Sequence, residues 1–248
     1  LCTWTVVRKL GEGGFGAVYL VKDQKNAEFA LKAEAADQSV KVLHLELRKA
    51  NTDKGNKQER FTLGCAISVG VKCLEAIEEL HGVGYLHRDI KPANYAIDKR
   101  DLRKIYLLDL GLCRKYVSRN GEIRAPRWAA GFRGTIRYAA LSCHISREQC
   151  RKDDLESWLY QQVELTTGNL PWKCLEQDKK LVAQSKEKCR TTSSAELFKD
   201  SPVEYSAILK YIDSLSYYAT PDYRKMKTLM QNALVNNNVK EYPYDWES

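Results

Sequence analysis

The fold of this chain is decided by eight residues a third of the way along it, His87-Arg88-Asp89-Ile90-Lys91-Pro92-Ala93-Asn94. They place a carboxylate, an ammonium group and an amide at Asp89, Lys91 and Asn94. A carboxylate can accept the proton of a hydroxyl, a lysine can neutralise a phosphate, and an amide oxygen can hold Mg²⁺. One face of a helix could not turn all three side chains towards one phosphate, so this spacing predicts a loop. The alternative is a basic surface loop in which the pattern arose by chance, and the neighbouring motifs argue against it.

The composition is that of an ordinary globular chain. Of the 248 residues, 44% are hydrophobic and 29% are charged, and no apolar run reaches the length of about 18 residues that a membrane span requires. The eight cysteines form no C-x-x-C pair, which argues against zinc and redox motifs and favours free thiols in the cytoplasm or nucleus.

The formal charge of +8 suits acidic partners. Because no nucleic-acid motif or basic amphipathic helix is present, we expect neither nucleic acid nor a membrane as a partner. We also expect the chain to be a monomer. The chain begins at Leu1, so we expect it to be a trimmed fragment.

A glycine-dense turn lies between two β-rich runs near the start of the chain. Its pattern is G-x-G-x-x-G-x-V, formed by Gly11, Gly13, Gly16 and Val18. Glycines let the backbone approach phosphates and present its N–H groups to them. A dinucleotide-binding turn shares part of this pattern, but a helix would then follow, whereas here a second strand is predicted. The pattern therefore predicts a β-hairpin that covers phosphates.

The next apolar run, Phe29-Ala30-Leu31-Lys32, ends in a lysine. It is similar to a strand whose lysine contacts nucleotide phosphates, and we predict Ala30 and Lys32 as nucleotide contacts. Residues 38–50 have a helical pattern, and Glu46 is the natural ion-pair partner of Lys32. Glu34 is nearer in sequence but would point elsewhere from the same strand. A solvated helix glutamate is the alternative for Glu46.

The clearest predicted helix covers residues 61–81, with Thr62 as its capping residue. Further helices are predicted over 205–215 and 224–235. In the helix predicted over 61–81, the apolar residues that recur at helical spacing are Leu63, Ile67, Leu74, Ile77 and Leu80.

A short strand ends in Asp109, fifteen residues after Asn94. An Asp at this place can hold a metal ion beside a phosphate, and a simple turn residue is the alternative. Farther along, Asp153 and Asp154 open an apolar helix. An Asp there can support the backbone of the 87–94 loop, and ordinary helix N-capping explains the pair equally well.

Together these motifs resemble a eukaryotic protein kinase from about Val6 to Glu247, which is nearly the whole chain. Residues 131–139, which read Gly-Phe-Arg-Gly-Thr-Ile-Arg-Tyr-Ala with no Ala-Pro-Glu after them, resemble the casein kinase 1 superfamily. His81-Gly82-Val83-Gly84-Tyr85-Leu86 and the terminal Tyr244-Asp245-Trp246-Glu247 resemble its tau-tubulin kinase branch.

The resemblance implies an α+β, two-lobed protein kinase fold as a single domain over 1–248. The small β-rich N-lobe would cover 1–50 and the helical C-lobe 61–248. It also implies ATP and Mg²⁺ as cofactors and transfer to Ser or Thr of protein substrates. Asp89, Lys91, Asn94 and Thr135 would be catalytic, and Asn94 and Asp109 would hold the metal ion.

The resemblance also implies an anion site for substrates. A basic residue at the position of Arg137 binds an anion in the family, and Lys186 matches a second basic position. With Arg133 they predict acidic or phosphorylated Ser/Thr substrates, since arginine meets phosphate in a bidentate way. A solvated basic surface is the alternative, and it is the better explanation for Arg119 and Arg124.

Three departures from the family pattern stand out. Ser142 replaces a usual Asn, and Glu156 replaces a usual Trp. The third is larger, because two strands and the adenine-binding hinge do not fit between Glu46 and Phe61. The N-lobe therefore looks truncated, whether through a splice form, a gene-model error or a real loss. A catalytically impaired kinase-fold binding module (a pseudokinase) is accordingly the alternative to an active enzyme.

Overall fold

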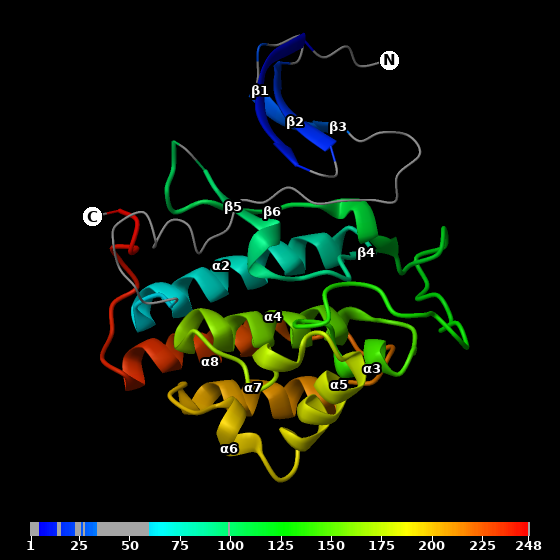
Figure 1. Cartoon of the computed structure of the whole chain (residues 1–248), viewed down its shortest axis with the longest axis vertical. Coiled ribbons are helices and arrows are strands. Elements are labelled where there is room, and N and C mark those ends of the chain that lie inside the picture. The colour runs from blue at the N-terminus through cyan, green and yellow to red at the C-terminus, as the bar shows by residue number, and fades with distance from the viewer. Residues whose placement is uncertain are drawn as a thin grey trace.

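The structure is a computed structural model of the chain, and it describes residues 5–13, 16–22, 26, 28–33, 60–98 and 100–247. It consists of a small three-stranded sheet and a larger, mainly helical part (Figure 1). The predicted helix over 38–50, with Glu46, and nearly all of the stretch between Glu46 and Phe61 lie outside the described residues. Among the residues described, no helix is long and apolar enough to cross a membrane.

The sheet contains β1 (Thr5–Gly13), β2 (Gly16–Lys22) and β3 (Glu28–Ala33), antiparallel in the order β1-β2-β3. The predicted β-hairpin is confirmed, because Gly11 pairs with Val18 and Gly13 pairs with Gly16 across β1 and β2. A strand and not a helix follows the glycines, which rules out the dinucleotide-binding turn.

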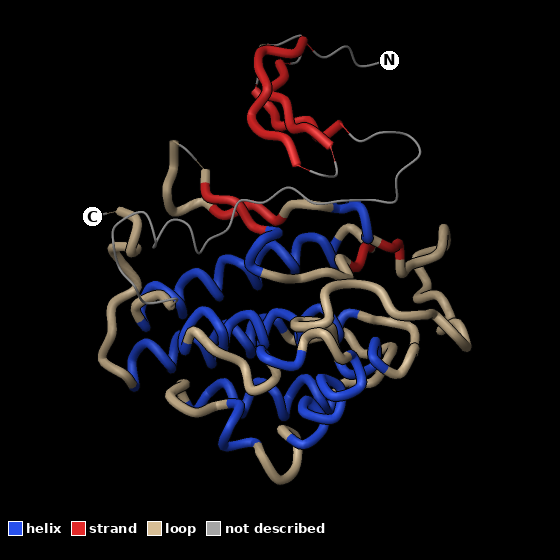
Figure 2. Tube along the Cα trace, viewed as in Figure 1, coloured by secondary structure: helices blue, strands red, loops and turns tan. Residues whose placement is uncertain are grey.

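The helical part is built around two central helices, α2 (Leu63–Gly82) and α4 (Arg151–Thr167), with α7 (Val203–Ser214) and α8 (Tyr223–Asn236) packed against them (Figure 2). Shorter helices are α3 (Leu141–His144), α5 (Lys179–Lys188) and α6 (Ser194–Leu197). The core between these helices consists of large side chains that water does not reach, among them Leu74, Ile77, Trp158, Tyr205 and Met230.

Two small strand pairs and three 3₁₀ turns lie beside the helices. The pairs are β4 (Tyr85–Leu86) with β7 (Arg114–Lys115), and β5 (Tyr95–Ile97) with β6 (Ile105–Leu107). The turns are η1 (Pro92–Asn94), η2 (Leu110–Leu112) and η3 (Lys173–Leu175). Residues 87–94 leave β4 and enter β5, so both strand pairs hold this loop at its ends.

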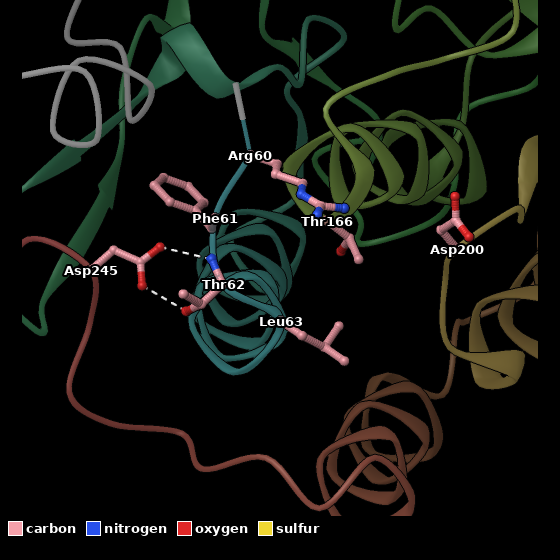
Figure 3. A pocket seen from close by; sticks show the side chains of 7 residues that line it. All are labelled: Arg60, Phe61, Thr62, Leu63, Thr166, Asp200 and Asp245. Atoms are coloured by element: carbon pink, nitrogen blue, oxygen red, sulfur yellow. Dashed lines mark hydrogen bonds between the residues drawn. The ribbon is translucent and has the colours of Figure 1, made fainter. Parts of the chain in front are cut away.

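Three of the predicted helices lie in the described residues and are confirmed, with small shifts at their ends. The helix expected over 61–81 is α2, and those expected over 205–215 and 224–235 are α7 and α8. Thr62 precedes α2 as predicted, but its side chain caps no helix N–H. Instead its backbone N–H and its hydroxyl donate to the two carboxylate oxygens of Asp245, at 2.8 and 2.6 Å (Figure 3). A carboxylate is favourable there because the N-terminus of a helix carries a partial positive charge.

Asp245 belongs to a C-terminal segment that packs along α2. Tyr244 in this segment is buried, and its hydroxyl lies 3.0 Å from Ser68 Oγ on α2. Trp246 Nε1 donates to Leu102 O at 3.0 Å, between β5 and β6. The segment thus connects the start of α2 to the strand pair that follows the 87–94 loop.

We expect Asp245→Ala to lower the free energy of unfolding by about 1–3 kcal/mol, because two hydrogen bonds to a charged group are lost. Chemical denaturation would measure this, with Glu187→Ala, a change at an exposed glutamate of α5, as the control. Equal stability of Asp245→Ala and the control would show that the carboxylate does not secure the start of α2.

Candidate active site

The loop over residues 87–94 is irregular up to the short turn η1, as its spacing predicts. Three of the predicted catalytic side chains meet there. Lys91 Nζ donates to Asp89 Oδ2 at 2.7 Å and to Thr135 Oγ1 at 2.9 Å. The Thr135 hydroxyl and its backbone N–H both donate to Asp89 Oδ1, each at 2.7 Å. Three donors therefore fix the orientation of the Asp89 carboxylate.

The approach of Thr135 to this carboxylate depends on Gly134. This glycine has a φ of +106°, a conformation that residues with a side chain rarely adopt. A Cβ atom there would lie 2.6 Å from Arg88 O, which is closer than such contacts allow. Glycine is therefore required for the 131–139 segment to reach the catalytic loop.

Asn94 and Asp109, the predicted metal ligands, lie on neighbouring segments of the chain. Asn94 Nδ2 donates to Asp89 O at 2.7 Å, while its Oδ1 is buried and has no hydrogen-bond partner among the described residues. Leu108 N donates to Asn94 O at 2.7 Å, which brings Asp109 next to Asn94 in space. An unpaired buried oxygen needs a partner, and Mg²⁺ commonly takes one or two protein oxygens together with water and phosphate. The residues present therefore fit Mg²⁺.

Asp154 holds the catalytic loop from the side of α4. It is 1% exposed, and its two oxygens accept the backbone N–H groups of His87 at 2.7 Å and Arg88 at 2.8 Å. His81 Nε2 lies 2.9 Å from the same carboxylate. Burial alone would raise the pKa of Asp154, but the hydrogen bond from His81 and the neighbouring His87 hold this pKa below its ordinary value. The carboxylate therefore stays charged and supports the loop.

Asp153, the neighbouring residue, has the other predicted role. Its carboxylate accepts the backbone N–H of Cys150, the residue before α4, and the hydroxyl of Ser142. Of the two explanations proposed for the Asp pair, support of the loop thus applies to Asp154, and capping of the helix N-terminus applies to Asp153. Burial raises the pKa of Asp153 to about 6.

Two of the three residues predicted for the anion site have partners within the fold. The Arg137 guanidinium contacts Glu164 Oε1 at 3.0 Å and forms a second ion pair with Glu176. Lys186 is fully buried, and its Nζ donates to the backbone oxygens of Ile136 and Ala139 at 2.8 and 2.7 Å. Both side chains thus find the partners within the fold that a charge removed from water requires. Of the three predicted residues, only Arg133 is exposed.

The predicted nucleotide contacts are located only by their backbone. The strand register places Lys32 opposite Val18 and Ala30 opposite Leu20. Glu46, the predicted partner of Lys32, lies outside the described residues. Contacts of the Gly-rich turn, Ala30 and Lys32 with a nucleotide therefore stay predictions.

Sequence reasoning missed the structural role of His87. Its ring is buried, and Nε2 lies 2.9 Å from Leu108 O, the residue before Asp109. It connects the catalytic loop to the predicted metal ligand. The signal was available, because His87 opens the motif that identified the loop.

The geometry agrees with comparisons to known proteins. The family model described as protein kinase domain matches residues 42–240. The chain belongs to the protein kinase family. A probable serine/threonine-protein kinase of Dictyostelium discoideum is 34% identical over 98% of this chain and 56% of its own length. The serine/threonine-protein kinase spe-6 of Caenorhabditis elegans is 31% identical over 99% of this chain and 76% of its own. A further C. elegans protein, provisionally named as a casein kinase I, is 29% identical over 98% of this kinase chain and 83% of its own.

Two features of these matches bear on the domain. This kinase chain spans little more than half the length of the Dictyostelium relative. The three alignments cover 284 to 286 positions, although the chain has 248 residues. Each relative therefore has at least 36 residues that face gaps in this chain.

The raised pKa of Asp153 predicts a pH-dependent effect of Asp153→Asn. A carboxyl group whose pKa is raised on folding contributes stability below its unfolded pKa, and this contribution is lost as pH rises through about 6. An Asn could keep both hydrogen bonds without charge. We therefore expect the melting temperature of Asp153→Asn, relative to wild type, to rise between about pH 4.5 and about pH 7.5. A pH-independent difference in thermal denaturation would contradict this expectation.

Proposed function

We propose that this kinase chain transfers the γ-phosphate of ATP, with Mg²⁺, to Ser or Thr hydroxyls of protein substrates. The observation that carries the proposal is the contact of Asp89, Lys91 and Thr135 beside the unpaired Oδ1 of Asn94. Phosphoryl transfer depends mainly on positioning and on neutralising charge, and this arrangement supplies groups for both.

Each residue has a defined part in the proposed reaction. Asp89 would accept the proton of the substrate hydroxyl, because its carboxylate is held in one orientation by Lys91 and Thr135. Lys91 would shift its ammonium group towards the transferred phosphate and offset its charge. The oxygens of Asn94 and Asp109 would hold Mg²⁺, which supplies charge neutralisation when bound.

The second candidate function is a kinase-fold binding module without efficient catalysis. The observation in its favour is the set of at least 36 positions that the relatives have and this chain lacks. If these positions include the two strands and the hinge that the sequence lacks, ATP would lose its adenine contacts while every catalytic residue stays in place.

Measurement of Mg²⁺-ATP binding and of phosphate transfer, with wild type and Asp89→Asn, distinguishes the two functions. We expect Asp89→Asn to bind Mg²⁺-ATP like wild type and to lose about 100-fold or more in transfer rate. Asp101→Asn, in the exposed turn between β5 and β6, is the control and should keep full activity. A wild type that binds no Mg²⁺-ATP would favour the binding module, and full turnover of Asp89→Asn would refute the assigned base.

Within the kinases, we propose the casein kinase 1 superfamily and its tau-tubulin kinase-like branch. Support comes from residues 131–139 and from the relative named as a casein kinase I. We also propose that substrates carry acidic or phosphorylated residues near the target Ser or Thr. Arg133 supports this, because it is exposed and lies two residues before Thr135, whose hydroxyl contacts Asp89.

A pair of peptides, one acidic or phosphorylated and one neutral, tests this preference. We expect wild type to favour the charged peptide, and Arg133→Ala to reduce the ratio of the two kcat/KM values. The effect should weaken as salt rises, because exposed charges are screened. Arg119→Ala, a change at another exposed arginine of the same region, is the control and should keep the wild-type ratio. An unchanged ratio in Arg133→Ala would exclude Arg133 as the source of the preference.

A further inference from the structure

A buried glutamate with two arginine partners lies just before α4. The Glu148 side chain is 3% exposed. Its Oε1 accepts from Arg127 Nη2 at 3.1 Å, and Arg127 Nε bonds to Oε2. Arg114 Nε lies 3.4 Å from Oε1. Nothing in the proposed reaction uses this cluster, although both arginines come from the segment between Asp109 and Thr135.

The two arginines lie near the two ends of that segment. Arg114 is in β7 and pairs with Leu86 of β4, and Leu86 directly precedes the catalytic loop. Arg127 lies on the approach to Thr135. Near it, Ala130 N donates to Ser146 O at 3.1 Å. Glu148 thus connects both ends of the 114–130 segment to the loop between α3 and α4.

The charges of Glu148 and its two arginine partners also act on the pKa of a third arginine, Arg88. Arg88, in the catalytic loop, has its pKa lowered by burial and then by the positive charges of Arg114 and Arg127, while Glu148 opposes this effect. Burial would raise the pKa of Glu148, but the hydrogen bond from Arg127 and the charge of Arg114 hold this pKa below its ordinary value. Glu148 is therefore charged, and its charge offsets a positive cluster one residue away from Asp89.

We propose that Glu148 is a positioning residue, a built-in anion that fixes the 114–130 segment against the catalytic loop. The segment is then held by a carboxylate of the chain itself, with no need for a bound or covalently attached anion. Removal of this carboxylate would leave three guanidinium groups close together, and such a cluster binds oxyanions. The consequence for catalysis rests on the proposed kinase activity, whereas the consequence for segment order does not.

Hydrogen exchange of the backbone amides over 114–130 tests the proposal without ATP. We expect exchange in Glu148→Ala to be about tenfold faster or more, since hydrogen bonds to a charged group are lost. Millimolar sodium sulfate should restore slow exchange, and sodium chloride at equal ionic strength should not. Glu122→Ala, a change at an exposed glutamate within the same segment, is the matched control and should exchange like wild type.

Specific sulfate rescue separates a positioning role from simple loss of stability. If the wild type is active, Glu148→Ala should lose kcat and regain it with sulfate but not with chloride. Exchange at the wild-type rate in Glu148→Ala, or equal effects of the two salts, would overturn the proposal. Should Glu148→Ala fail to fold, Glu148→Gln keeps the side-chain size and undergoes the same test. An inactive wild type with sulfate-dependent ordering in the variant would refute the kinase activity and leave this inference intact.

Discussion

The catalytic loop depends on one buried carboxylate. Asp154 accepts the N–H groups of His87 and Arg88, and its charge is sustained by His81. Arg88 has a φ of +69°, which is an uncommon conformation for a residue with a side chain. The bonds to Asp154 offset the cost of this conformation, and they fix the backbone from which Asp89, Lys91 and Asn94 project. A buried charge that lost these partners would be strongly destabilising, so the loop and α4 are stable only together.

The same principle extends to the segment that follows. Carboxylates of the helical part meet its arginines, with Glu148 bound to Arg127 and Glu164 bound to Arg137. An excess of basic residues that suggests a substrate-binding surface is therefore used in large part to hold the segment in place. Of the residues predicted for the anion site, Arg133 is the exposed one. Ion pairs in this region thus help to fix the geometry around Thr135.

This kinase domain has its predicted catalytic residues in contact but is shorter than the same region of its relatives. The residues that would handle the phosphate and the proton are in contact, and the Gly-rich hairpin is formed. Relatives have at least 36 residues that this chain lacks. Because catalysis and nucleotide affinity rest on different contacts, a domain can keep the first set while its hold on adenine is weakened. This separation explains why both an enzyme and a binding module are compatible with a complete catalytic loop.

The sequence by itself determined the loop, the hairpin and the main helices, because each follows from local spacing of residue types. It also indicated Asp89, Lys91, Asn94 and Thr135 as members of one site, through short motifs that resemble those of a kinase family. Only the tertiary structure decided which polar groups from distant parts of the sequence meet. Asp245 meets Thr62 across 183 positions of sequence, and Lys186 is buried against backbone 47 to 50 positions away. Such pairs depend on how helices and loops pack against each other, and no local pattern in a single sequence records that packing.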